Sequence, residues 1–222
     1  MQTFEFEVND FKATVIIPDN PNGKWIWKTE FFFAFDQAER SLLDMGYTRV
    51  YYQINDMYGS KRAVKLMANF HDVLLKKFPM LDSKPYLFGF SRGGLYAFNY
   101  ALTYPKRVNK IYLDAPVLNL KSWPKNGSNE QKQFIKEYNI VDLDAFCDSP
   151  IDHLDEFFTY NIPTFIVAGD SDEIVPFSEN GQIMIDKATK LKQDVKYILK
   201  KGCGHHPHSL KYVTPIVDFI IK

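Results

Sequence analysis

The chain has 222 residues, which suits one domain with a full hydrophobic core. Its 27 Lys and Arg balance its 27 Asp and Glu, so no charge excess predicts binding to nucleic acid or to an anionic membrane surface. Aromatic residues make up 16% of the chain, which favours a large core and an aromatic-lined pocket.

The first part of the chain predicts a hairpin followed by an alternation of helices and strands. Alternating apolar and polar residues predict strands over Thr3–Val8 and Phe11–Pro18, joined by the turn "ND". After the turn residues "DNPNGK", we expect a helix over Thr29–Met45, a strand over Arg49–Asn55 and a helix from Ser60 to Phe78.

The rest of the chain continues this alternation. The elements expected, in order, are strand Pro85–Phe90, helix Arg92–Thr103, strand Lys110–Pro116, strand Pro163–Gly169, helix Ser178–Leu191, strand Asp194–Lys200 and helix Ser209–Ile221. Buried apolar strands between helices predict an α/β protein whose mostly parallel sheet has helices on both faces. The irregular segment Val117–Tyr160 is too long for an ordinary loop. We therefore expect a single domain over residues 1–222, with a small cap insertion at about 117–160.

The N-terminal residues have neither the basic start nor the unbroken apolar core of a signal peptide. No apolar run reaches the roughly 18 residues that a membrane span needs. The cysteines, Cys147 and Cys203, lack the CxxC spacing of redox and zinc motifs, and sequence alone leaves a disulfide between them open. The simplest expectation is a soluble cytoplasmic protein with reduced thiols.

A serine among glycines, in "GFSRGG" (Gly89–Gly94), separates a predicted strand from a predicted helix. This is the context in which G-x-S-x-G places a nucleophile on a sharp turn above the carboxyl edge of the sheet. Glycines are needed there because a Cβ atom at Gly89 or Gly93 would clash. We expect Ser91 to be the nucleophile and the Arg92 N–H to stabilise an oxyanion. The alternative is a glycine-rich turn with an idle serine.

A serine nucleophile needs a base, and an acid and a histidine follow it in the chain. The loop "VAGDSDEIVP" offers Asp170 and Asp172, and "LDAPV" offers Asp114 as a competing acid. The loop "KGCGHHPHSL" offers three histidines, of which His205 directly follows a glycine and is favoured as the base over His206 and then His208. Three histidines within four residues also suggest a metal site, but Pro207 disturbs the spacing, and we predict no metal or cofactor.

On these motifs the sequence resembles the α/β-hydrolase superfamily, most specifically at Gly89–Gly94, Gly169–Pro176 and Gly202–His208. The segments "GFSRGGL", "DAPV", "SWP", "VPFSEN" and "GHHPHSL" also resemble a subgroup of small bacterial serine hydrolases. The resemblance implies the α/β-hydrolase fold, with a mostly parallel sheet of eight strands, and a Ser–His–Asp hydrolase. The pattern G-x-x-D-x-x-V-P implies that Asp172 is the acid, which leaves Asp170 to cap its turn.

The sequence departs from the superfamily in the loop "DNPNGKWIWKTEFF", which lacks the H-G-G-G string that often supplies a second oxyanion donor. We expect this donor near Trp25, with Trp27 as a wall of the acyl site; in the alternative, both tryptophans only pack the first helix onto the sheet. The other candidate substrate-binding residues are Tyr58, Trp123 and His206.

The function expected is a carboxylesterase-like serine hydrolase (EC 3.1) that cleaves a small or medium acyl ester through Ser91, His205 and Asp172. A serine peptidase or an acyltransferase could use the same three groups. A non-catalytic binding protein on a hydrolase scaffold is the third hypothesis, and the presence of all three groups weighs against it.

Overall fold

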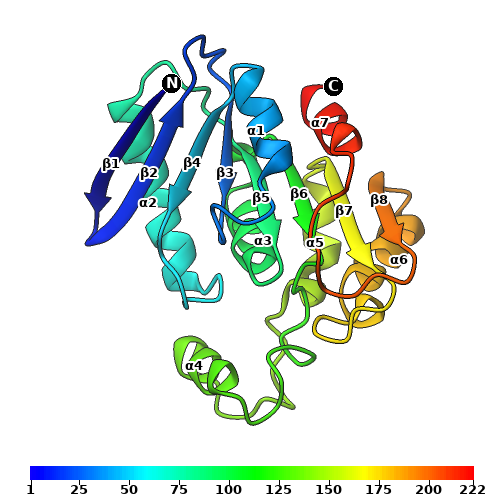
Figure 1. The fold of residues 1–222 in the computed structure, drawn as a ribbon. Coiled ribbons are helices and arrows are strands. Elements are labelled where there is room, and N and C mark those ends of the chain that lie inside the picture. The colour runs from blue at the N-terminus through cyan, green and yellow to red at the C-terminus, as the bar shows by residue number, and fades with distance from the viewer.

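The computed structural model describes residues 1–222 and contains one eight-stranded sheet with the strand order β1-β2-β4-β3-β5-β6-β7-β8 (Figure 1). The strands are β1 Gln2–Val8, β2 Phe11–Ile17, β3 Trp25–Lys28, β4 Thr48–Tyr52, β5 Tyr86–Phe90, β6 Lys110–Asp114, β7 Thr164–Gly169 and β8 Val195–Lys200. β2 pairs antiparallel with β1 and β4, and all other pairs are parallel. The strand order reverses beside β3 and β5, and ligands bind at such a switch point in open α/β sheets.

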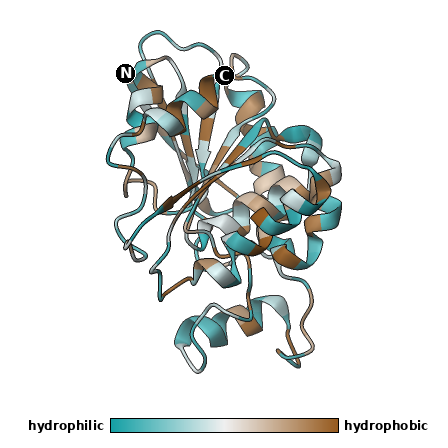
Figure 2. Ribbon diagram, turned by 90° about the vertical axis from the view of Figure 1, so that its right-hand side faces the viewer, coloured by the Kyte–Doolittle hydropathy of each residue, from teal (hydrophilic) through white to brown (hydrophobic).

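Helices cover both faces of the sheet. They are α1 Gln37–Asp44, α2 Lys61–Lys77, α3 Gly93–Thr103, α4 Asn129–Tyr138, α5 Leu154–Thr159, α6 Gly181–Leu191 and α7 Thr214–Ile221, with 3-10 turns at Pro105–Arg107, Pro150–His153 and Phe177–Glu179. One hydrophobic core unites the sheet with α2, α3, α5 and α6, and a second unites it with α1 and α7. Figure 2 shows the hydrophobic residues along the strands and on the helix turns around them. The predicted α/β class and mostly parallel sheet are therefore confirmed.

The sequence-based prediction is wrong about β3, which it assigns to a loop, and about the first helix, which begins at Gln37 rather than Thr29. All four residues of β3 are buried, so its sequence "WIWK" lacks the alternation that marks a half-exposed strand. Lys28 is tolerated there because its Nζ lies 2.7 Å from Glu39 Oε1 of α1, and both side chains are only 1% exposed. This ion pair joins α1 to β3 and therefore fixes both ends of the loop between them.

The segment between β6 and β7 leaves the sheet at its carboxyl edge. α4 stands beyond the ends of the strands, away from the helices that cover the two faces (Figures 1 and 2). A third apolar cluster joins α4 to the body; it consists of Tyr58, Leu95, Val117, Leu120, Phe134 and Val175. α5, in contrast, packs into the main core through Leu154, Phe157 and Phe158. We propose that the part around α4 is the cap.

None of the helices combines the length and the apolar character that crossing a bilayer requires. Both cysteines are free thiols; Cys147 is exposed and Cys203 is partly buried.

Candidate active site

Ser91 lies on a strained turn between β5 and α3, as the sequence predicts. Its φ is +50°, in the left-handed region that residues with a side chain rarely adopt. A Cβ atom at Gly89 would lie 2.9 Å from the Gly93 carbonyl oxygen, and one at Gly94 would lie 2.8 Å from Pro116 Cβ. At Gly93 it would lie 3.1 Å from Glu30 Cβ, which is tight rather than impossible. The turn therefore needs glycine most at Gly89 and Gly94.

The structure brings Ser91, His205 and Asp172 into one hydrogen-bonded chain. His205 Nε2 lies 3.0 Å from Ser91 Oγ, and His205 Nδ1 lies 2.7 Å from Asp172 Oδ2. The three residues are 6–8% exposed, so they are largely shielded from solvent. This is the arrangement in which a base withdraws the serine proton while a carboxylate orients the base.

Asp172 is held as a carboxylate. Its Oδ1 accepts hydrogen bonds of 2.9 Å from the N–H groups of Ile174 and Val175. Burial alone raises the pKa of Asp172, but the hydrogen bonds from His205, Val175 and Ile174 outweigh it and bring this pKa below its usual value. The acid therefore stays charged beside His205.

Two contacts join the acid loop to the histidine loop. The Ser171 N–H donates to the Cys203 carbonyl at 3.0 Å, and the Gly202 N–H donates to Asp170 Oδ1 at 2.7 Å. Gly169 allows the close approach, because a Cβ atom there would lie 2.1 Å from the Cys203 carbonyl oxygen. Asp170 thus connects the two loops, and it is Asp172 that reaches His205.

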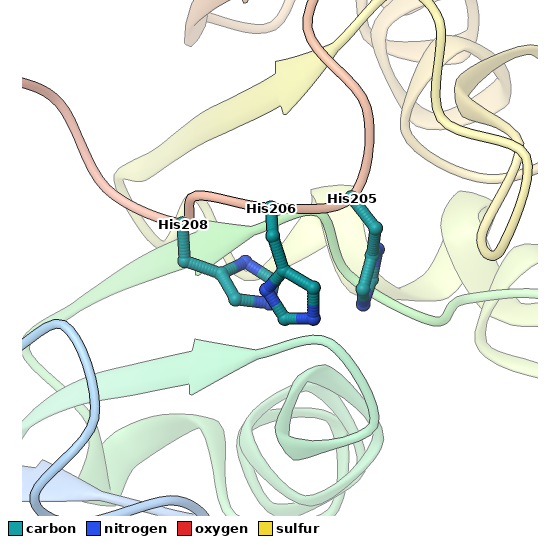
Figure 3. Close-up of side chains that lie close together, drawn as sticks. All are labelled: His205, His206 and His208. Atoms are coloured by element: carbon teal, nitrogen blue, oxygen red, sulfur yellow. The ribbon is translucent and has the colours of Figure 1, made fainter.

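The competing acid Asp114 pairs with a different histidine. Its Oδ1 lies 2.7 Å from His208 Nδ1, and its Oδ2 accepts from the Ser209 N–H at 2.8 Å and from the Tyr112 hydroxyl. His206 is exposed, and its ring stacks on Phe35 with 5.8 Å between centroids. Figure 3 shows the three histidines side by side on one loop. Only His205 is bonded to Ser91.

The structure contradicts the predicted roles of Trp25 and Trp27. Trp27 is level with Leu87 of β5, four residues before Ser91, so it lies roughly 13 Å from Ser91 along the strand direction at about 3.3 Å per residue. Both tryptophans are at most 1% exposed, and their rings stack on each other. Trp25 Nε1 donates to the Asp82 carbonyl at 2.7 Å. The two side chains are core residues, and this error follows from the missed strand.

The loop that faces Ser91 is the one after β3. Thr29 Oγ1 donates to the Gly93 carbonyl at 2.7 Å, which holds this loop against the nucleophile turn. The backbone N–H groups of Glu30, Phe31 and Arg92 make no hydrogen bond within the protein. Free N–H groups on both sides of the serine could bind an oxyanion. Sequence reasoning would have found this loop had it recognised β3.

Glu30 is a buried acid beside the nucleophile turn that sequence reasoning missed. It is 2% exposed, and its Oε1 lies 3.5 Å from Arg92 Nε, while Arg92 Nη1 bonds to Asp56 at 2.8 Å. Burial raises the pKa of Glu30 to about 7, against the opposing charge of Arg92.

Replacing Glu30 with Gln should stabilise the protein at pH 8 but not at pH 4. Because the folded-state pKa of about 7 exceeds the ordinary value of 4.5, the wild type loses stability as pH rises between these values. The loss is on the order of 3 kcal/mol, from about 1.36 kcal/mol for each pH unit. Urea unfolding at several pH values measures it. In the matched variant Glu7→Gln, at an exposed position on β1, no such pH-dependent difference is expected; equal pH profiles for wild type and Glu30→Gln would contradict the prediction.

The other candidate substrate-binding residues lie around the proposed cap. Tyr58 is fully buried, and its hydroxyl donates to Gln133 of α4 at 2.8 Å, so it holds the cap rather than lining an open pocket, contrary to the prediction. Trp123 lines a cavity of about 990 Å³ whose other wall includes Glu173 and Ile174. Ser91 and His205 do not line this cavity. A substrate-binding role of Trp123 or His206 stays a prediction.

Comparisons with known proteins agree with this fold. The family described as "alpha/beta hydrolase fold" matches residues 65–138, a range that includes the Ser91 turn. A search of curated proteins gives no match. Among solved structures, an acylaminoacyl peptidase from Pyrococcus horikoshii is similar with a TM-score of 0.70 at 15% identity; the match covers 92% of this chain and 37% of that one.

Two enzymes of more similar length also match. A carboxylesterase from Lactobacillus plantarum has a TM-score of 0.69 at 15% identity, with 93% of this chain and 85% of that one covered. S-formylglutathione hydrolase from Staphylococcus aureus has a TM-score of 0.69 at 14% identity, with 99% and 94% covered. The chain thus spans little more than a third of the peptidase but most of the two smaller enzymes. The family match across the nucleophile turn and these structural similarities agree that the chain has the α/β-hydrolase fold.

Proposed function

We propose that the protein is a serine hydrolase that cleaves an acyl ester through Ser91, His205 and Asp172. The fold, with esterases and peptidases as structural neighbours, supports hydrolase activity. The observation that favours these three residues is the chain of two hydrogen bonds, 3.0 Å from Ser91 Oγ to His205 Nε2 and 2.7 Å from His205 Nδ1 to Asp172.

In the proposed mechanism, His205 Nε2 takes the proton of Ser91 as Oγ attacks the acyl carbon. Asp172 keeps the His205 proton on Nδ1 and stabilises the imidazolium that forms. The free N–H of Arg92, with that of Glu30 or Phe31, binds the oxyanion, and each such donor is worth about 3 kcal/mol of the barrier. His205 then protonates the leaving group. Water attacks the acyl-enzyme by the same route and restores Ser91.

An ester is proposed as the substrate because the structural match covers 85% of a carboxylesterase and 94% of an S-formylglutathione hydrolase, but only 37% of the peptidase. An exposed apolar side chain lies beside the nucleophile turn: Phe31 is 39% exposed, and its ring lies 5.5 Å from the guanidinium carbon of Arg92. It favours an apolar acyl group.

The substrate class is tested with p-nitrophenyl esters of increasing acyl length and with aminoacyl p-nitroanilides. Wild type should hydrolyse the esters with the higher kcat/KM, and Ser91→Ala should hydrolyse neither. Amides cleaved as efficiently as esters would overturn the ester assignment in favour of a peptidase. Ester hydrolysis that persists in Ser91→Ala would overturn the assignment of the nucleophile.

A further inference from the structure

Three histidines of the loop after β8 present their side chains to one point. The ligand nitrogens of His205, His206 and His208 lie within 4.8 Å of one another. In Figure 3 the three rings extend from the same side of the loop. The sequence argues against a metal site because Pro207 disturbs a helical spacing of the histidines. In the structure this segment is a loop rather than a helix, so that objection does not apply.

Two of the three histidines already have the outer partners that metal-binding histidines have. A ligating imidazole usually donates its other N–H to a carboxylate, which fixes its tautomer. His205 Nδ1 lies 2.7 Å from Asp172, and His208 Nδ1 lies 2.7 Å from Asp114, so both side chains present Nε2. His208 Nε2 and both ring nitrogens of His206 have no hydrogen bond in the structure, whereas His205 Nε2 is bonded to Ser91 Oγ at 3.0 Å.

We propose that His205, His206 and His208 bind one Zn²⁺ ion, and that this ion inhibits the hydrolase. The inhibitory part rests on the proposed function, because the ion takes the His205 Nε2 lone pair that receives the Ser91 proton. Three neutral histidines with an open fourth position are an established zinc ligand set. The ion is a regulator of the site and has no part in hydrolysis.

The geometry needs only a small rearrangement. Zinc–nitrogen distances of about 2.0–2.1 Å place two ligands of a tetrahedral ion about 3.3 Å apart, so the farthest nitrogens must approach by about 1.5 Å. Of the three rings, His206 is the one free to move toward the other two, because it is exposed and held by stacking on Phe35. His205 and His208 are buried and fixed by their carboxylates.

Zinc binding is measured first on full-length Ser91→Ala, by competition with a chromophoric chelator. Ser91 is not a ligand, so this variant reports the site whether or not the protein is a serine hydrolase. We expect one ion per chain, and an affinity lowered more than about tenfold when His206→Ala is added, since loss of an outer partner alone costs about 10–100-fold. The control is His153→Ala, because His153 is bonded to Asp148 and lies outside the cluster. Adding this substitution should leave the zinc affinity unchanged. Binding that His206→Ala leaves unchanged, or no binding at all, overturns the site.

Inhibition is then measured on the active protein, with each variant compared with its own metal-free rate. Zn²⁺ should abolish ester hydrolysis, EDTA should restore it, and His206→Ala should need more than about tenfold more Zn²⁺. Hydrolysis that zinc-loaded wild type retains or increases overturns the inhibitory role. If the wild type cleaves no ester at all, the proposed function fails and the inhibitory role fails with it, while binding to Ser91→Ala still decides the metal site.

Discussion

Replacing His205 with alanine is expected to lower kcat for ester hydrolysis by about 10⁴- to 10⁶-fold. The variant loses the nitrogen that lies 3.0 Å from Ser91 Oγ, and no other histidine is bonded to Ser91. Asp172→Asn should cost about 10⁴-fold, because an amide no longer favours the tautomer that leaves Nε2 free to accept a proton. Steady-state kinetics at substrate saturation measures both effects.

Asp170→Asn is the matched control for Asp172→Asn. Asp170 is two residues earlier in the same loop, and its Oδ1 accepts hydrogen bonds from the Gly202 N–H and the Ser171 hydroxyl. An asparagine oxygen can accept the same bonds, so kcat should stay close to that of wild type. An equal loss in Asp170→Asn and Asp172→Asn would mean that the acid is wrongly assigned.

Gly169→Ala is expected to abolish most activity although Gly169 is not part of the proposed mechanism. The new Cβ atom would lie 2.1 Å from the Cys203 carbonyl oxygen and 2.5 Å from that of Gly204. Both are backbone atoms of the two residues that precede His205, so the loop must move and take the imidazole with it. A displacement of about 1 Å at a reacting group costs on the order of 10²-fold in rate, and the crowding costs about 1–3 kcal/mol of stability.

Gly204→Ala is the control for Gly169→Ala. It tests whether the loss comes from the steric clash at Gly169 or from placing any alanine in these loops. A Cβ atom at Gly204 meets only the Ser171 carbonyl oxygen, at an ordinary 3.7 Å. Kinetics and urea unfolding should therefore show a small change in Gly204→Ala and a large one in Gly169→Ala. Similar values for the two variants would contradict the steric explanation.

The positions of Ser91, Asp172 and His205 could be predicted because each follows a strand within a few residues. The carboxyl ends of β5, β7 and β8 lie at the same edge of the sheet, so three local patterns far apart in the chain meet there. The sequence offers Asp170, Asp172 and Asp114 as possible hydrogen-bond partners of the histidines. Sequence could rank them, but the pairing of Asp114 with His208 depends on how the final loop folds back onto β6.

The position of the proposed second oxyanion donor could not be predicted, because it depends on where β3 ends. A four-residue strand that is buried on both faces has no periodicity, and the burial of its lysine depends on an ion pair with Glu39 of α1, which is distant in sequence. Without β3, the sequence predicts the donor near Trp25, which is the first residue of the strand and lies at its far end from Ser91. The burial of Tyr58 is unpredictable for a related reason, because it depends on α4, which no local pattern positions.

The most direct measurement is the reaction of the folded wild-type protein with a fluorophosphonate probe, with the modified residue located by mass spectrometry. An activated serine should give one adduct per chain, on Ser91, which is absent from Ser91→Ala and forms far more slowly in His205→Ala. A wild type that resists the probe, or that is labelled equally well after Ser91→Ala, would show that Ser91 is no activated nucleophile.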